Sequence, residues 1–137
     1  MAAYPQVLHT VLDTTNAREL AEFYRELLGL RYRPGDDPPP ADVADDADWL
    51  VLVDAAGHRQ LAFQQVDELQ PTTWPAPDVP MQLHLDLTVE TVAELERQRA
   101  RAEALGARLL LDRTEDPDEP LYVFADLAGH PFCVFVG

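Results

Sequence analysis

The chain has 137 residues, 47% of them hydrophobic, and its 25 acidic against 10 basic side chains give a formal net charge of −15. Such an acidic surface repels phosphate backbones and anionic lipids, so we expect neither nucleic acid nor a membrane as a partner. No apolar run approaches the roughly 20 residues that span a bilayer, residues 1–6 do not resemble a signal peptide, and one cysteine cannot form an internal disulfide. These features favour a cytoplasmic protein.

The size and apolar content predict a single domain, residues 1–137, built from two modules that share one core. The modules are expected at about residues 5–69 and 81–137. Between them, Gln70–Pro80 holds four prolines, which exclude helix and interior strand and indicate a connector.

The first half is predicted to form a strand, a helix and three further strands. Val7–Asp13 is apolar and β-branched, as in a strand, and Thr14, Thr15 or Asn16 can cap a helix that ends at Gly29. The apolar stripe of this helix is Leu20, Phe23, Tyr24, Leu27 and Leu28. The remaining segments are a strand at Leu30–Arg33, an acidic loop at Pro34–Asp48, and a hairpin of Trp49–Val53 with Gln60–Val66 around Asp54–His58.

The second half repeats this order. Met81–Val89 is predicted as a strand and Glu90–Leu105 as a helix that ends at Gly106. The inward positions of this helix are Val92, Leu95, Ala102 and Leu105. The later strands are Ala107–Asp112, Tyr122–Asp126 and Phe132–Val136. Because strands and helices do not alternate strictly, the predicted class is α+β rather than doubly wound α/β.

A short motif occurs twice in the chain. Asp54-Ala55-Ala56-Gly57-His58 returns in the second half as Asp126-Leu127-Ala128-Gly129-His130. A Leu-His pair also recurs, ending at His9 and again at His84, and so does a helix-ending Leu-Gly pair. Three landmarks in the same order and at a nearly constant offset indicate a duplicated module, with a ligand expected in a cleft between the halves.

Several stretches resemble the vicinal oxygen chelate superfamily, which includes glyoxalase I, extradiol dioxygenases, and fosfomycin and bleomycin resistance proteins. They are Ala21–Leu30 with its Phe-Tyr and Leu-Gly pairs, His84–Leu87, Leu105–Ala107, and the turn Asp126–Phe132. The resemblance implies two tandem βαβββ modules whose mixed sheet forms a cup, the glyoxalase/bleomycin resistance/dihydroxybiphenyl dioxygenase-like fold. It also implies a homodimer rather than a monomer.

The same resemblance implies metal ligands on the first and last strands of each module. These positions fall on His9, on His84, on Cys133 where the family usually has Glu, and on either Leu61 or Gln64 in the first module. Without a carboxylate, neither a glyoxalase-type proton shuttle nor a two-His, one-carboxylate iron centre is complete. No metal site is therefore assigned. If Zn, Ni, Mn or Fe binds, His9 and His84 would hold it.

Strand alternation predicts which side chains line the ligand pocket. Gln82, His84, Asp86 and Thr88 share a polar strand face, which should line the cavity. The predicted pocket residues are His9, Trp49, Phe63, Gln64, His84, Asp86 and Cys133. Structural roles remain open for them: a hydrogen-bonded core or dimer histidine, a solvated aspartate, or a buried thiol that behaves as a small hydrophobe.

Three functions follow as hypotheses. The favoured one is a glyoxalase-like protein that binds a small aromatic or oxygenated molecule in the cup without the standard metal site. The second is a divalent-metal-dependent lyase, isomerase or dioxygenase of the superfamily. The third is a degenerate module that serves as an interaction partner. Whether the protein is an enzyme is left open.

Overall fold

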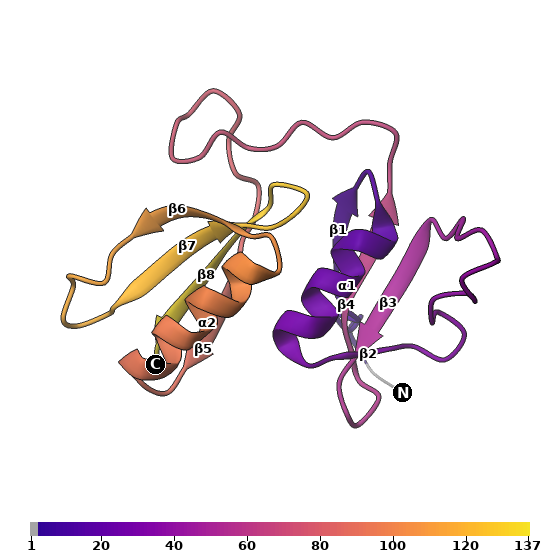
Figure 1. Ribbon diagram of the computed structural model, residues 1–137, viewed down its shortest axis with the longest axis horizontal. Coiled ribbons are helices and arrows are strands. Elements are labelled where there is room, and N and C mark those ends of the chain that lie inside the picture. The colour runs from indigo at the N-terminus through magenta and orange to yellow at the C-terminus, as the bar shows by residue number, and fades with distance from the viewer. Residues whose placement is uncertain (1–2) are drawn as a thin grey trace. The chain divides into compact units, whose positions relative to one another are not determined.

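The computed structural model describes residues 3–137, which form two compact units that divide between Leu69 and Gln70. Each unit is a βαβββ module, with one helix packed on its own four-stranded mixed sheet (Figure 1). The predicted α+β class and the duplicated module order are therefore confirmed. The segment predicted as a connector, Gln70–Pro80, groups with the second unit. No helix in residues 3–137 has the length and apolar character needed to cross a membrane.

The first module orders its strands β1-β4-β3-β2. Strands β1 and β4 run parallel, whereas β4, β3 and β2 pair antiparallel. The elements are β1 (Thr10–Thr14), α1 (Ala17–Leu28), β2 (Arg31–Tyr32), β3 (Trp49–Val53) and β4 (Arg59–Gln65).

The second module repeats this topology as β5-β8-β7-β6, with β5 and β8 parallel and the other pairs antiparallel. Its elements are β5 (Leu85–Val89), α2 (Val92–Ala104), β6 (Arg108–Asp112), β7 (Leu121–Ala125) and β8 (Pro131–Val136).

The first strand of each module, β1 and β5, begins later than predicted. The residues before them lack a ladder partner, since pairing starts at Thr10 in the first module and at Leu85 in the second. Val7 is 94% exposed, so an apolar, β-branched sequence did not suffice to extend the sheet. Consequently His9 and His84 stand just ahead of their strands.

Helix α1 begins and ends where its predicted caps place it, whereas α2 begins later than predicted. Asn16 accepts a hydrogen bond from the Glu19 amide, and Gly29 ends α1 in the left-handed region at φ 67°. Thr91 caps α2 in the same way by accepting from the Glu94 amide. The helix therefore starts at Val92, two residues after the predicted Glu90. Val92 was predicted to face inward, but it is 55% exposed in the first turn of α2, whereas Leu95 is fully buried.

The duplicated motif is a turn held by its aspartate. Asp54 Oδ1 accepts hydrogen bonds from the Ala56 and His58 amides, each at 2.9 Å. Asp126 Oδ1 accepts the same pair of bonds from Ala128 and His130, at 2.9 and 3.0 Å. In each copy the glycine has a positive φ. Each copy of the motif therefore forms an Asx turn.

Stacked rings identify the helix-facing side of each sheet. Phe63 of β4 stacks on Tyr24 of α1 with ring centroids 5.9 Å apart. In the second module the Tyr122 hydroxyl of β7 donates to Glu96 of α2 at 2.7 Å. Phe124, two residues along β7 and on the same face, stacks on Phe132 of β8 at 5.3 Å, and both rings are fully buried. Because side chains alternate along a strand, the neighbours of these residues point to the opposite side, here called the distal face of each sheet.

Candidate ligand site on the second module

Strand register fixes which residues of the two modules are equivalent. In the first module Leu52 pairs with Leu61 while Val53 pairs with Arg59, so Gln60 is an extra, bulged residue. The matching β7–β8 pairing has no such shift. The first-module equivalent of Cys133 is therefore Ala62, one residue beyond the position given by counting from the turn.

A cluster of three polar side chains lies on the distal face of the second module. Asp86 on β5 is the register partner of Cys133 on β8. His84, just before β5, places Nε2 3.2 Å from Asp86 Oδ1. One potential ligand atom from each of the three residues lies within 4.8 Å of the other two. The structure thus brings together three residues that the sequence placed in one pocket.

The Cys133 thiol is held in its neutral form. Burial, followed by the negative charge of Asp86 and a hydrogen bond with that carboxylate, raises the pKa of Cys133 to about 11. At neutral pH the thiol donates to Asp86 and is a poor nucleophile. The carboxylate therefore contacts both other members of the cluster. It remains 58% exposed and can accept a further hydrogen bond from a ligand.

The Phe135 ring lies on the same sheet face as the cluster, although the sequence did not place Phe135 among the pocket residues. Phe135 follows Cys133 by two residues on β8, on the same face, and pairs in register with Thr88. It is only partly buried, so its ring can contact a bound molecule. Its two-residue spacing from Cys133 was the available signal, but the ring was equally compatible with a core position.

The distal face of the first module is apolar at the corresponding positions. Val11, Ala62 and Val51 lie side by side in register, where the second module has Asp86, Cys133 and Val123. Val51, Val53 and Ala62 form a buried cluster against Trp49. This face has no acidic or thiol side chain at the equivalents of Asp86 and Cys133.

The His9 imidazole lies beside this apolar cluster. Its ring lies 6.1 Å from the Trp49 ring, and its Nδ1 is buried without a hydrogen-bond partner among the described residues. Burial, and then the positive charges of Arg59 and Arg33, lower the pKa of His9 from 6.5, which favours the neutral imidazole. His9 and His84 belong to different units, and their joint role as metal ligands stays a prediction.

Three other candidate residues of the first module lie on different sides of its sheet. Phe63 was expected in the pocket, but it is fully buried against α1, so it contributes to the core. Leu61 also lies on the helix-facing side, 5% exposed, and offers no ligand. Gln64 is on the distal face, exposed and in register with Trp49, and its pocket role stays a prediction.

The donor set of the cluster suits some metal ions better than others. An imidazole nitrogen, a carboxylate oxygen and a thiol sulfur match Zn²⁺, whose ligand bonds of about 2.0–2.3 Å keep ligand atoms roughly 3.3–3.8 Å apart. The observed separations, 3.2 Å and up to 4.8 Å, need only small side-chain rotations to reach that range. Thiol sulfur is a poor ligand for Mn²⁺ and Mg²⁺, which prefer oxygen.

The tandem βαβββ modules define the fold of the vicinal oxygen chelate class. Residues 9–135 match the model of the glyoxalase-like domain family, so the chain belongs to that family. No curated protein sequence matches the chain.

Solved structures share the fold at low sequence identity. A glyoxalase/bleomycin resistance protein/dioxygenase family enzyme from Burkholderia phytofirmans is 14% identical with a TM-score of 0.68, over 94% of this chain and 96% of that one. The fosfomycin resistance protein FosX from Listeria monocytogenes, complexed with Mn(II) and sulfate, is 16% identical with a TM-score of 0.65, over 100% and 94%. A possible glyoxalase from Bacillus cereus is 15% identical with a TM-score of 0.63, over 94% and 96%.

Proposed function

We propose that this chain binds a small oxygenated or aromatic molecule on the distal face of its second module, without the standard metal site of the superfamily. The observation that carries the proposal is the pair of residues at the last-strand positions. The Cys133 thiol is neutral and hydrogen-bonded to Asp86. Its first-module equivalent, Ala62, has no side-chain atom that could bind a metal. A metal would therefore lack the carboxylate that the resemblance requires there.

The cluster offers the groups that such a ligand needs. Asp86 and His84 are 58% and 40% exposed in their side chains, so they can accept from or donate to a hydroxyl or carbonyl. Phe135 and Thr88 continue the same face and provide an aromatic surface beside the polar atoms. An oxygenated ring would contact both parts at once.

The test uses metal-stripped protein and three oxygenated aromatic probes: catechol, mandelate and phenylphosphonate. Amide chemical shifts should move saturably at His84, Asp86, Cys133 and Phe135 for at least one probe. Asp86→Asn should weaken that binding about three- to tenfold, because a charge-assisted hydrogen bond is lost. Glu90→Gln makes an equal charge change at an exposed residue that has no hydrogen-bond or ion-pair partner within residues 3–137, and it should leave the affinity unchanged. No saturable shift with any of the probes would refute the proposal.

A metal-dependent function is the second candidate, favoured by the proximity of three donor atoms. FosX from Listeria holds Mn(II) in its solved complex, but this donor set includes sulfur and better fits Zn²⁺. His84, Asp86 and Cys133 would hold such an ion, and it would supply Lewis acidity to a bound carbonyl or hydroxyl. Titration with Zn²⁺, Ni²⁺, Mn²⁺ and Fe²⁺ on untagged protein decides between the candidates. Stoichiometric binding that is lost in His84→Ala supports the metal-dependent function and contradicts the metal-free one.

The assembly and location belong to the same proposal. We propose a homodimer in the cytoplasm, in keeping with the class and with a single, neutral cysteine that forms no internal disulfide. Light scattering coupled to size exclusion should give a mass of about twice the 15.3 kDa of the chain. A monomer across the accessible concentration range would contradict this part of the proposal alone.

A further inference from the structure

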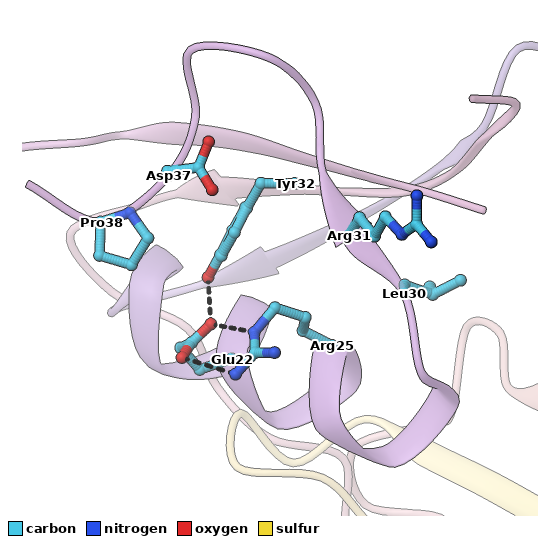
Figure 2. A pocket seen from close by; sticks show the side chains of 7 residues that line it. All are labelled: Glu22, Arg25, Leu30, Arg31, Tyr32, Asp37 and Pro38. Atoms are coloured by element: carbon cyan, nitrogen blue, oxygen red, sulfur yellow. Dashed lines mark hydrogen bonds and ion pairs between the residues drawn. The ribbon is translucent and has the colours of Figure 1, made fainter. Parts of the chain in front are cut away.

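A separate pocket lies in the first module, between the middle of α1, the turn into β2 and the start of the acidic loop. It is an open pocket with a volume of about 490 Å³, within the usual range for small-molecule sites. Figure 2 shows the side chains that line it: Glu22, Arg25, Leu30, Arg31, Tyr32, Asp37 and Pro38. No residue of the His84–Asp86–Cys133 cluster takes part, so the pocket is independent of the function proposed above.

The centre of this pocket is internally neutralised. Glu22 Oε2 accepts from Arg25 Nε at 2.6 Å and from the Tyr32 hydroxyl at 2.7 Å, and Arg25 adds a second bond at 3.2 Å (Figure 2). Arg25 keeps the pKa of Glu22 below its usual value, so the carboxylate stays ionised. Burial raises the pKa of Tyr32 to about 12, so its hydroxyl stays a donor. These three groups satisfy one another and leave no net charge.

Two charges at the rim of the pocket are unmatched. The Arg31 guanidinium and the Asp37 carboxylate make no side-chain hydrogen bond or ion pair within residues 3–137. Most other arginines of the chain do pair, as Arg18 does with Asp45 at 2.7 Å and Arg33 with Asp36 at 3.1 Å. In a chain with 25 acidic and only 10 basic residues, an arginine left without a carboxylate beside a pocket is available for a ligand.

The two free charges lie on opposite sides of the pocket. In Figure 2, Arg31 stands beside Leu30 on one side, Asp37 stands beside Pro38 on the other, and Tyr32 lies between them. One face of the Tyr32 ring is covered by Arg18, whose guanidinium carbon is 4.9 Å from the ring centroid. A complementary molecule would therefore carry its charges at its two ends, joined by a short apolar chain.

We propose that this pocket binds a small zwitterion of the ω-amino carboxylate class. Its carboxylate pairs with Arg31, which can form two parallel hydrogen bonds, and its ammonium pairs with Asp37. The methylene chain packs on Leu30, Pro38 and the edge of Tyr32. A simple anion would leave Asp37 unmatched and be repelled by it, and a simple cation would meet the same difficulty at Arg31.

The test is an amide chemical-shift titration of the full chain with 6-aminohexanoate as the probe. Saturable shifts are expected at Leu30, Arg31, Tyr32 and Asp37, and none at His84, Asp86 or Cys133. Hexanoate and hexylamine, which carry one charge each, should bind about three- to tenfold more weakly. Added salt should weaken all three, because the rim charges are exposed.

Two variants and two matched controls complete the experiment. Arg31→Gln and Asp37→Asn should each lower the affinity for 6-aminohexanoate about three- to tenfold. Arg108→Gln and Asp78→Asn change exposed charges of the second unit that have no ion-pair partner among the described residues, and they should leave the affinity unchanged. Absence of saturable shifts, or full affinity in Arg31→Gln, overturns the proposal. Equal affinity for hexanoate overturns the zwitterion assignment. None of these outcomes alters the probe binding expected at Asp86.

Discussion

The two modules share topology and turn motif but differ on their distal faces. Val11, Ala62 and Val51 of the first module correspond to Asp86, Cys133 and Val123 of the second. One face is an apolar cluster, and the other carries a carboxylate, a thiol and the nearby His84. The scaffold is the same in both copies, whereas this polar cluster is present in the second copy only. Fold and function therefore have to be argued from different residues.

The helix-facing layers should be equally essential in both modules, and Phe63 provides the largest expected effect. Phe63→Ala removes a fully buried ring stacked on Tyr24 and should cost about 3–5 kcal/mol of unfolding free energy. Its exposed neighbour on the other face, Gln64→Ala, should change stability by less than about 0.5 kcal/mol. Urea denaturation measures both. A Phe63→Ala variant near wild-type stability would return this residue to the list of pocket candidates.

The glycine of the duplicated turn has different surroundings in the two modules. Gly57 and Gly129 both have positive φ, 87° and 94°, so alanine at either position costs about 1–2 kcal/mol in backbone strain. An added Cβ at Gly57 meets nothing within 4 Å, whereas at Gly129 it would lie 2.6 Å from Pro71 Cβ. Gly129→Ala should therefore be the more destabilising, by about 1–3 kcal/mol.

A second substitution tests the cause of that difference. Pro71→Gly removes the opposing Cβ, so in this background the extra cost of Gly129→Ala should largely disappear in urea denaturation. If Gly57→Ala and Gly129→Ala cost the same, the close approach of Pro71 carries no energetic weight.

Much of the fold was accessible from the sequence because local signals agreed. The caps at Asn16 and Gly29, the apolar stripe of α1 and the Asp-Gly turns each have a short-range physical cause. The strand starts were less accessible. Pairing decides where a strand begins, and the partner of Thr10 is Leu61, far along the chain at the other end of the module.

The site was predicted in part for the same reason. Alternation along one strand placed His84 and Asp86 together, and the turn motif located Cys133. The bulge at Gln60 could not be foreseen, so counting from the first turn gave Leu61 instead of Ala62. The pocket between α1 and β2 was missed because its charges come from a helix, a strand and a loop with no common periodicity.

The pKa of Cys133 should depend on Asp86, an effect without a counterpart at Ala62, the equivalent position of the first module. Since the charge of Asp86 helps to raise the thiol pKa to about 11, Asp86→Asn should lower that pKa. A fall of about one unit increases the thiolate fraction at pH 8 about tenfold, and the rate of reaction with a disulfide reagent with it. Glu90→Gln is the matched control. An unchanged rate in Asp86→Asn would mean that Asp86 does not help to raise the pKa of Cys133.

The smallest effect is expected at His9. Its pKa is lowered in the folded protein, so the unfolded chain binds the proton more readily. His9 therefore contributes stability that is present above pH 6.5 and is lost as the pH falls from there towards its folded pKa. Imidazole NMR titration should give a midpoint below 6.5, and Arg59→Gln should raise it by a fraction of a unit, because one of the two opposing charges is removed.

Arg108→Gln, in the other module, is the matched control and should leave the His9 midpoint unchanged. A midpoint at or above 6.5 in the wild type would show that the buried Nδ1 has found a partner that stabilises its protonated form. The apolar cluster of the first module would then adjoin a hydrogen-bonded polar group. The contrast between the modules would be one of degree, and His9 would become the first residue to test as a ligand contact.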